Sequence, residues 1–224
     1  MRCVSDDEMP PSVGEPPGEP RAPIEVDVVL FDVGGVLSQD RVEDKLADLA
    51  AKHRVSYAEL LAVKDPIRLE ADLGRISDGE FWRQVLATVG VTASRADLAI
   101  EPYLAEVPGT LAEVRRLRGQ VRMGILSNDS RELSRARRDR HGFDQLFDPI
   151  IISAHVGMVK PHGEIYEYAV DLLGVAAERC LFIDNLADNV AAARRCGLAA
   201  LHFTTAARLA TDLEAFRWLP PGDD

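Results

Sequence analysis

Residues suited to phosphoryl transfer recur along the 224-residue chain, each at or soon after the end of a short apolar run. They are Asp32, the pair Ser127 and Asn128, Lys160, and the group Asp184, Asn185 and Asp188. An aspartate can accept a phosphoryl group as a covalent nucleophile and lose it again to water. A hydroxyl, an amide and an ammonium group can hold the phosphoryl oxygens while charge redistributes. We therefore predict catalytic roles for Asp32, Ser127 and Lys160.

The stretch after Asp32 adds two glycines, which let backbone N–H groups approach an anion closely because they carry no side chain. The predicted phosphate-binding residues are Gly34, Gly35, Ser127, Asn128 and Lys160. Carboxylate, amide and carbonyl oxygens also suit Mg²⁺, which prefers hard oxygen ligands. The predicted metal ligands are Asp32, the backbone carbonyl near Gly34, Asp184, Asn185 and Asp188.

Each of these side chains also has a purely structural explanation. Ser127 could cap the helix that follows it, Lys160 could lie on the surface, and the acids at 184 and 188 could be turn residues. Four such groups at four successive strand ends are nevertheless much less expected by chance, which favours a shared site.

The chain around these residues has the pattern of a parallel α/β sheet. Residues 28–37, VVLFDVGGVL, begin with a continuous apolar run, which is typical of a strand buried on both faces. From residue 108 onward, strand-like runs alternate with helix-like stretches, which predicts parallel strands with helices on both faces. In such a Rossmann-like, doubly wound sheet, the carboxyl ends of the strands converge on one crevice. The predicted strands are 24–32, 121–126, 149–153, 179–183 and 199–203, and the predicted helices are 109–118, 130–141, 163–174, 187–196 and 206–216.

Residues 38–106 show helical patterns and no convincing strand. Asp40 and Ser77 are each followed three residues later by glutamate, which predicts helix starts. Pro66 is predicted to end a short helix, and a further helix is predicted over 94–106. We therefore expect a small helical-bundle domain inserted into an α/β core domain. The predicted boundaries are 24–37 and 107–218 for the core, 38–106 for the helical insertion, 1–23 for a disordered acidic, proline-rich tail, and 219–224 for a second tail.

Composition limits the partners and the location. Lysine and arginine number 26 against 37 acidic residues, and this net charge of −11 argues against nucleic acid or an anionic membrane as a partner. No apolar run is long enough to span a membrane, and residues 1–23 lack a signal-peptide pattern. Three cysteines without metal-type spacing indicate reduced thiols in a cytoplasmic protein. The basic stretch 130–141 is interpreted as a solvent-exposed face, and both a monomer and a homodimer stay open.

Four segments together resemble the motifs of the haloacid dehalogenase-like hydrolase superfamily, in their order and spacing. They are LFDVGGVL at 30–37, ILSN at 125–128, VGMVKP at 156–161 and LFIDNLADNVAAARRCGL at 181–198, with GRISDGEFW at 74–82 resembling a helical cap between the first two motifs. The resemblance implies a Rossmann-like core, a mobile cap, Mg²⁺ and a phosphatase acting on small phosphate esters. It also implies that Asp32 is the nucleophile, that Ser127 and Lys160 hold the transferred group, and that Asp184 belongs to the metal cluster.

Two positions depart from the family's usual pattern. Gly34 stands where its phosphatases have a second aspartate that acts as general acid and base, a contribution of about 10²–10⁴-fold. Asn185 stands where a second aspartate is common, and an amide ligates Mg²⁺ without adding charge. These departures leave two alternatives to a phosphatase: a catalytically weak or inactive binding protein, or a dehalogenase-type hydrolase. The candidate cap arginines for a dehalogenase are Arg41, Arg68 and Arg75.

The selective contacts to the substrate are expected from residues 40–106, because the cap supplies them in the family. Candidates include Arg68, Arg75, Phe81 and Trp82. The two aromatic residues are adjacent and cannot share one helical face, so we expect one in the core of the bundle and the other facing the crevice.

Overall fold

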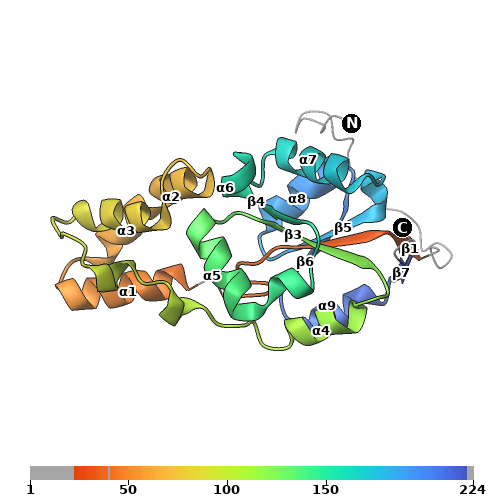
Figure 1. The fold of residues 1–224 in the computed structure, drawn as a ribbon, viewed down its shortest axis with the longest axis horizontal. Coiled ribbons are helices and arrows are strands. Elements are labelled where there is room, and N and C mark those ends of the chain that lie inside the picture. Colours follow the sequence, from red (N-terminus) through yellow and green to blue (C-terminus); the bar gives the residue numbers. More distant parts are fainter. Residues whose placement is uncertain (1–22, 40, 221–224) are drawn as a thin grey trace, which may run out of the picture.

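The computed structural model describes residues 23–39 and 41–220, which form two parts. An α/β core carries a parallel sheet, and a group of helices lies at one end of it (Figure 1). The helical group follows the first strand of the large sheet and precedes the second, as the sequence predicts. The fold is therefore a Rossmann-like α/β core with a helical insertion.

The large sheet has five parallel strands in the order β4-β3-β2-β5-β6. Their bounds are β2 Val28–Phe31, β3 Arg122–Ser127, β4 Ile150–Ile152, β5 Cys180–Asp184 and β6 Ala199–His202. All four residues of β2 are buried, as expected for a central strand with helices on both sides. Because the strands are parallel, the loops after β2, β3 and β5 emerge at the same edge of the sheet.

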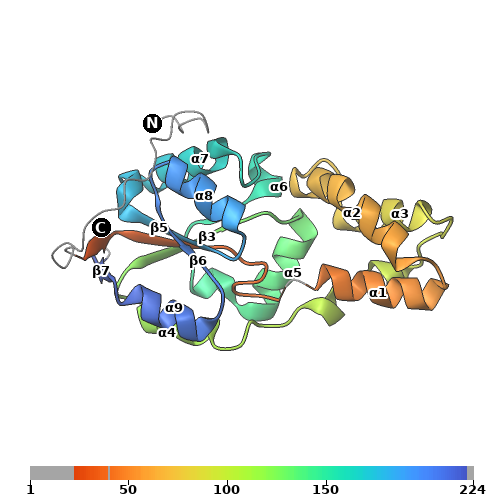
Figure 2. The ribbon, with the colours of Figure 1, turned by 180° about the vertical axis from the view of Figure 1, so that it is seen from behind.

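Helices cover both faces of this sheet (Figures 1 and 2). One face packs against α4 (Thr110–Leu117) and α9 (Ala206–Leu213), and the other against α7 (Gly163–Leu173) and α8 (Ala187–Arg195). Their apolar residues recur at helical spacing and interlock with those of the strands. The remaining core helices are α5 (Arg131–His141), the short α6 (Ser153–Val156), and 3₁₀ helices at Phe143–Gln145 and Ala177–Arg179.

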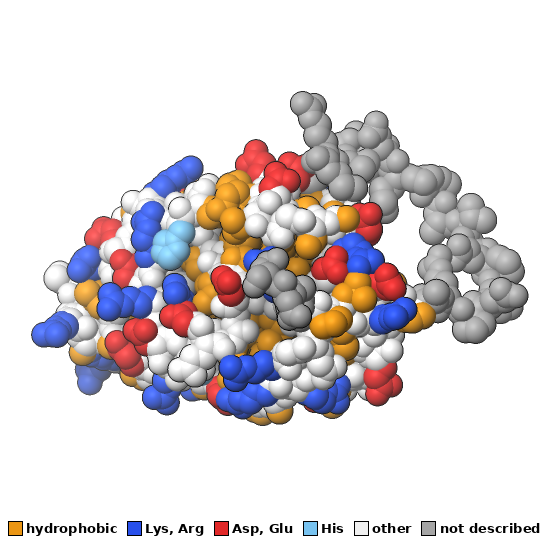
Figure 3. All heavy atoms as spheres, turned by 45° about the vertical axis from the view of Figure 1, so that its right-hand side comes forward, with side chains coloured by type: hydrophobic (Ala, Val, Ile, Leu, Met, Phe, Trp, Pro, Cys, Tyr) orange, Lys and Arg blue, Asp and Glu red, His pale blue; other side chains and the backbone are white. Residues whose placement is uncertain are grey.

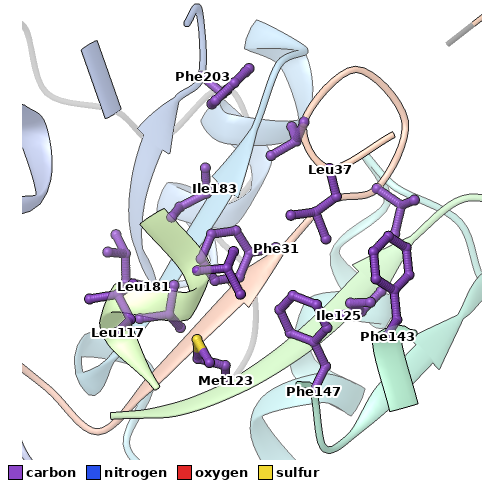
Figure 4. Close-up of a cluster of buried hydrophobic side chains, with 14 of the residues drawn as sticks. Phe31, Leu37, Leu117, Met123, Ile125, Phe143, Phe147, Leu181, Ile183 and Phe203 are labelled. Carbon is purple, nitrogen blue, oxygen red and sulfur yellow. The ribbon is translucent and has the colours of Figure 1, made fainter. Parts of the chain in front are cut away.

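Aromatic and aliphatic side chains fill the face beneath α4 and α9 (Figure 4). Phe31 contacts Phe147 edge-to-face with 5.7 Å between the ring centroids, and Phe147 meets Phe143 in the same way. Full burial of each such side chain contributes about 1.5–3 kcal/mol to the free energy of unfolding. This packing holds β2 rigidly, and with it the loop that begins at Asp32.

A second, two-stranded parallel sheet corrects the prediction at both ends of the core. β1 (Ile24–Val26) pairs with β7 (Phe216–Trp218), so the predicted strand 24–32 is two strands, and the predicted last helix ends at residue 213. The break lies at Asp27, whose carboxylate pairs with the Arg179 guanidinium. A charged, paired residue at this point stops the chain from continuing as one buried strand.

The helical insertion contains α1 (Val42–His53), α2 (Tyr57–Asp72) and α3 (Asp78–Ala87), which pack around their own apolar cluster. Ser56 and Ser77 accept N-cap hydrogen bonds at the starts of α2 and α3, whereas Asp40 lies outside the described residues. The prediction that Pro66 ends a helix is wrong, because α2 runs across it. Packing of α2 against both α1 and α3 outweighs the one backbone hydrogen bond that proline removes.

The segment after α3 also differs from the predicted helix over 94–106. It forms two 3₁₀ helices, Arg95–Leu98 and Glu101–Tyr103. Asp97 explains the early stop, because its carboxylate accepts from Ser94 and from the Lys52 ammonium and so fixes a capping box in place of a longer helix.

Two sequence-based expectations about the environment have different outcomes. None of the helices in the described part of the chain is long and apolar enough to cross a membrane.

Cys180 is a buried free thiol, as expected, but Cys196 is disulfide-bonded, which contradicts the expectation of reduced cysteines throughout. Pairing depends on Cα atoms coming within about 4.4–6.8 Å, which spacing along the sequence does not reveal. Cys3 lies outside the described residues.

Candidate active site

Two aspartates at the carboxyl ends of β2 and β5 both contact one lysine. Lys160 Nζ lies 2.7 Å from Asp32 Oδ1 and 2.7 Å from Asp184 Oδ2. All three residues are at most 6% exposed. Asp32 and Asp184 terminate adjacent parallel strands, so the sheet itself sets the distance between them. Three residues that the sequence separates by up to 152 positions therefore form one buried charged cluster.

Burial and charge act in opposite directions on the pKa values of this cluster. Burial raises the pKa of Asp32 to about 6; Lys160 opposes that rise and the Asp184 carboxylate adds to it. Burial alone would lower the pKa of Lys160, but the two carboxylates outweigh it and raise the value above its ordinary range. The lysine is therefore cationic, and Asp32 is mostly ionised near neutral pH, as a nucleophile must be.

The loop after β3 is tied to the lysine loop by two backbone-directed hydrogen bonds. Asn128 Nδ2 donates to the carbonyl of Lys160, and Asn128 Oδ1 accepts from the Lys160 N–H, both at 2.9 Å. Ser127 lies beside this amide but is 1% exposed, and its hydroxyl donates to Asp129 Oδ2. Asn128 therefore contacts Lys160 directly, whereas the Ser127 hydroxyl is directed to Asp129.

The glycine loop after Asp32 packs against the loop after β5. Gly35 has a φ of +79°, and a Cβ there would lie 2.4 Å from Asn185 Nδ2, so a side chain has neither the conformation nor the space. Asn185 Oδ1 is buried and has no hydrogen-bond partner among the described residues. Asp188 is exposed and takes no part in this cluster, whereas Asn189 is buried and donates to Asp184 Oδ2 at 2.9 Å.

These oxygens can be tested for their fit to a metal ion. No group of three or more histidine, cysteine, aspartate or glutamate side chains with metal-site geometry occurs in residues 23–39 and 41–220. The carboxylates of Asp32 and Asp184 nevertheless share one lysine, and Asn185, whose buried amide oxygen has no partner among the described residues, lines the same cavity as Asp32. Carboxylate and amide oxygens are hard donors. The side chains of Asp32, Asp184 and Asn185 fit Mg²⁺. Asp188, which was also predicted to bind the metal, lies outside this set.

A cavity of about 290 Å³ connects this cluster with the helical insertion. At the core end it is lined by Asp32, Gly34, Asn128, Lys160 and Asn185. At the other end it is lined by Lys64, Asp65, Arg68, Asp72 and Phe81 of the insertion and by Asp129 and Arg137 of the core. A small molecule held here touches both parts of the protein.

Arg137 is a lining residue that sequence reasoning missed. The prediction placed it on a solvent-exposed basic face, but it is 5% exposed and Nη1 donates to Asp129 Oδ1 at 2.6 Å. Its neighbours in sequence, such as Arg135 and Arg138, do lie towards solvent. The missed signal is spacing, because Arg137 follows the buried Leu133 by four positions and so shares its helical face.

One buried carboxylate of the insertion, that of Asp78, takes part in the contacts between the insertion and the core. Asp78 accepts from the Ser130 hydroxyl at 3.1 Å, from Trp82 Nε1 at 3.0 Å and from Arg68 Nη1 at 3.2 Å. Its own N–H donates to the carboxylate of Glu132 in the core. Two of these contacts cross from one part to the other, so Asp78 fixes the insertion over the cavity.

Of the other residues predicted to select the substrate, most lie at the cavity and one lies on the surface. Arg68 and Phe81 line the cavity, and Trp82 lies buried beside it, bonded to Asp78. Arg75 is 62% exposed and pairs with Glu70 on the surface.

The parallel α/β core with a helical insertion after its central strand also occurs in solved structures. A solved HAD family enzyme from Bacteroides thetaiotaomicron, in complex with magnesium and inorganic phosphate, has this fold with a TM-score of 0.65 at 20% identity, over 80% of this chain and 95% of that one. The sequence model of the haloacid dehalogenase-like hydrolase family matches residues 26–197. The protein belongs to this family.

Curated relatives of the chain include phosphatases. It is 27% identical to a sesquiterpene phosphatase of Aspergillus oryzae over 83% of this chain and 92% of the relative. It is also 27% identical to a pyrimidine 5'-nucleotidase of Escherichia coli, over 59% of this chain and 63% of that protein. The family and these relatives together identify the chain as a hydrolase.

Proposed function

We propose that the protein is a Mg²⁺-dependent phosphatase that hydrolyses a small phosphorylated metabolite through an aspartyl-phosphate on Asp32. The observation that carries the proposal is the buried cluster in which Lys160 Nζ lies 2.7 Å from both Asp32 and Asp184, at one end of the 290 Å³ cavity. A carboxylate and an ammonium group at the closed end of a cavity suit attack on phosphorus and stabilisation of its oxygens. The phosphatase relatives support the same reaction.

In the first step, Asp32 Oδ forms a bond to phosphorus while the bond from phosphorus to the ester oxygen breaks. The leaving oxygen takes a proton from a solvent water molecule and departs as an alcohol. In the second step, a water oxygen bonds to phosphorus, the Asp32–phosphorus bond breaks, and inorganic phosphate leaves with the carboxylate restored. The Lys160 ammonium holds the phosphoryl oxygens in both steps, and Asn128 fixes the backbone at Lys160. The predicted contact of Ser127 to the phosphoryl group requires its hydroxyl to turn away from Asp129.

Mg²⁺ held by Asp32, Asp184 and Asn185 would neutralise phosphoryl charge and orient the ester. The proton needed by the leaving oxygen has no donor at Gly34, where no side chain exists. Loss of a general acid typically lowers a rate by about 10²–10⁴-fold, so we expect slow turnover that depends on how well the alcohol leaves.

The size and lining of the cavity support a small substrate. A volume of about 290 Å³ lies just below the range of about 300–1,000 Å³ for ligand pockets. Because Arg68 and Phe81 line it from the helical insertion, we assign the insertion, residues 38–106, the role of a cap that contacts the leaving group. In this proposal the residues of the core carry out the reaction, and the cap determines which substrates bind.

A second candidate function is a binding protein that holds phosphorylated ligands without turnover. Two observations favour it: Gly34 removes the proton donor, and Asn185 brings an uncharged oxygen to the metal position. The same crevice and the same lysine would then serve recognition alone.

Phosphate release separates the two functions. We expect release from some members of a panel of small phosphate esters, dependent on Mg²⁺ and abolished in Asp32→Asn. Turnover that survives Asp32→Asn would contradict the assignment of the nucleophile. No release from any ester, together with tight ester binding, would establish the binding protein.

We also propose a cytoplasmic monomer or homodimer without a nucleic-acid partner. The net charge of −11 supports the absence of nucleic acid, and on the core face in Figure 3 basic and acidic side chains are interspersed. The disulfide at Cys196 is the observation against a reducing compartment. Thiol titration of protein isolated under acid quench tests it, and three free thiols are the result expected in the cytoplasm.

A further inference from the structure

The site lacks a proton donor at the position next to the nucleophile, because Gly34 has no side chain. Without another donor, the leaving oxygen must take its proton from water. Water is a weak acid near neutral pH, whereas a positioned carboxyl group typically contributes about 10²–10⁴-fold as a general acid. A carboxyl group with an oxygen open to the cavity would therefore replace the missing donor.

Among the described residues, three carboxylates line the cavity in addition to that of the predicted nucleophile. Asp129 is 2% exposed and has both oxygens occupied, Oδ1 by Arg137 and Oδ2 by the Ser127 hydroxyl. Asp65 is 79% exposed, which places its carboxylate in solvent and not in the enclosed part of the cavity. The third, Asp72, is neither sealed nor open to bulk solvent.

Asp72 is the last residue of α2 and keeps one carboxylate oxygen available. Arg68 Nε donates to Asp72 Oδ1 at 2.8 Å, and Arg68 Nη2 lies 2.7 Å from the same oxygen. Oδ2 accepts no hydrogen bond from the described residues and is not fully buried. The side chain is 13% exposed and lines the cavity that holds Asp32. Arg68 therefore holds one oxygen of Asp72 while the other stays open.

Burial and the neighbouring charges together favour the neutral form of this carboxyl group. Burial raises the pKa of Asp72; Arg68 opposes the rise, and the carboxylates of Asp129 and Asp78 add to it. Arg68 is also shared between two acids, because its Nη1 donates to Asp78 at 3.2 Å. Asp72 thus keeps a proton to higher pH than an exposed aspartate does, as a general acid must.

Lys45 is a second titratable group near the cap end of the cavity. Burial lowers the pKa of its ammonium to about 8, with nearby carboxylates opposing. Its Nζ donates to the Ala99 carbonyl at 2.8 Å and lies 4.0 Å from the centroid of the Trp82 ring. It lines a neighbouring cavity of about 30 Å³ and not the one that holds Asp32. Lys45 is therefore less well placed than Asp72 to reach a leaving oxygen.

We propose that Asp72 is the general acid and base of the reaction, and that Arg68 is the positioning residue that holds it. In the first step, the proton on Asp72 Oδ2 moves to the ester oxygen as the bond from that oxygen to phosphorus breaks, and an alcohol leaves. In the second step, Asp72 takes a proton from the water whose oxygen bonds to phosphorus, which restores the neutral carboxyl group. The proposal rests on the phosphatase function proposed above. A solely structural role, in which Asp72 only fixes Arg68, is the alternative.

Two small phosphoryl donors of similar shape test the proposal. Ethyl phosphate needs a proton on its leaving oxygen, whereas acetyl phosphate releases acetate, which is stable as an anion. Asp72→Asn keeps an acceptor for Arg68 but has no acidic proton, so we expect kcat/KM for ethyl phosphate to fall by about 10²-fold and kcat/KM for acetyl phosphate to stay nearly unchanged. We choose kcat/KM because it reports the steps up to phosphorylation of Asp32, before the second step that both donors share.

Two further variants serve as controls. Glu70→Gln makes the same carboxylate-to-amide change in a surface pair of the same helix and should keep both values of kcat/KM. Asp72→Glu keeps a carboxyl group and should retain more activity on ethyl phosphate than Asp72→Asn does. Equal losses for the two donors in Asp72→Asn would indicate the structural role and overturn the proposal, while the phosphatase function would stand. Hydrolysis of neither donor by the wild type would overturn both.

The wild type alone supplies a second measurement, which does not depend on the folding of a variant. Ethyl, 2-fluoroethyl and 2,2,2-trifluoroethyl phosphate are close in size but release alcohols of increasing acidity. With Asp72 as the donor, kcat/KM should vary little along this series, because the acid compensates for a poor leaving group. A steep rise with the acidity of the alcohol, as expected when water is the donor, would overturn the proposal.

Discussion

The two ends of the cavity are built in different ways. At the core end, Asp32 and Asp184 stand at the ends of adjacent strands and share the ammonium of Lys160. At the cap end, the charged residues pair within each part, Arg68 with Asp72 in the insertion and Arg137 with Asp129 in the core. The two parts meet beside them, where the Ser130 hydroxyl donates to Asp78. The core end is fixed by the sheet, so its geometry follows from topology. The cap end depends on how the insertion docks, so it can differ between proteins that share the same core.

Removing the lysine is expected to have the largest effect. Lys160→Ala leaves two buried carboxylates without their cation and removes a donor to the phosphoryl oxygens. We expect kcat to fall by about 10²–10³-fold, measured as phosphate release. Breaking such a buried pair should also lower the free energy of unfolding by about 3–5 kcal/mol, measured by urea denaturation.

A second lysine variant is the control for Lys160→Ala, which is also expected to lower stability. Lys64→Ala removes a cap lysine that pairs with the exposed Asp65 and should change kcat far less. If the two lysine variants lose equal activity, the distinction between the two ends of the cavity is wrong.

Breaking the contact of the cap with the core should have an intermediate effect. Asp78→Ala removes the acceptor for Ser130, Trp82 and Arg68, and leaves buried donors unpaired. We expect the free energy of unfolding to fall by about 3 kcal/mol, and kcat/KM to fall roughly tenfold because the cap no longer encloses the substrate.

The matched control for this variant is Glu80→Ala. Glu80 lies on the same helix, and among the described residues its carboxylate bonds only to nearby Arg83 and Gln84, so its loss should cost at most about 0.5 kcal/mol. Equal effects of Asp78→Ala and Glu80→Ala on kcat/KM would show that docking of the cap does not matter for activity.

The last predicted effect needs no substitution and is one of pH at the core end. Burial raises the pKa of Asp32 to about 6, with Lys160 opposing, so protons compete with Mg²⁺ for this carboxylate as the pH falls through 6. Affinity for Mg²⁺ should therefore be about tenfold lower at pH 5 than at pH 7.5, since each pH unit below the pKa removes about nine-tenths of the carboxylate. Calorimetric titration at both pH values checks this, and equal affinities would exclude Asp32 as a ligand.

The sequence predicted the core better than the insertion, for a physical reason. Buried strands such as residues 28–31 and 180–183 are continuous apolar runs, and the rule that parallel strands end at one edge places Asp32 and Asp184 together. The course of α2 across Pro66 depends on packing from both sides, which no local pattern contains.

Individual side chains of the site also differ in how well the sequence predicted their positions. Lys160 was predicted from its place after a predicted strand and in a family motif, and the structure places its ammonium against the two aspartates. Arg137 was assigned to the surface because four other arginines surround it in the sequence, yet only its helical face decides its burial. The catalytic and metal-binding roles of these residues stay predictions.

Detection of the covalent intermediate tests the central claim most directly. The wild type is mixed with a hydrolysed ester and Mg²⁺, quenched in acid within milliseconds to seconds, digested, and analysed by mass spectrometry. A phosphoryl group on the peptide that contains Asp32, absent from Asp32→Asn, is the predicted result. Turnover without any phosphorylated peptide, or with the phosphoryl group on another residue, would contradict the account.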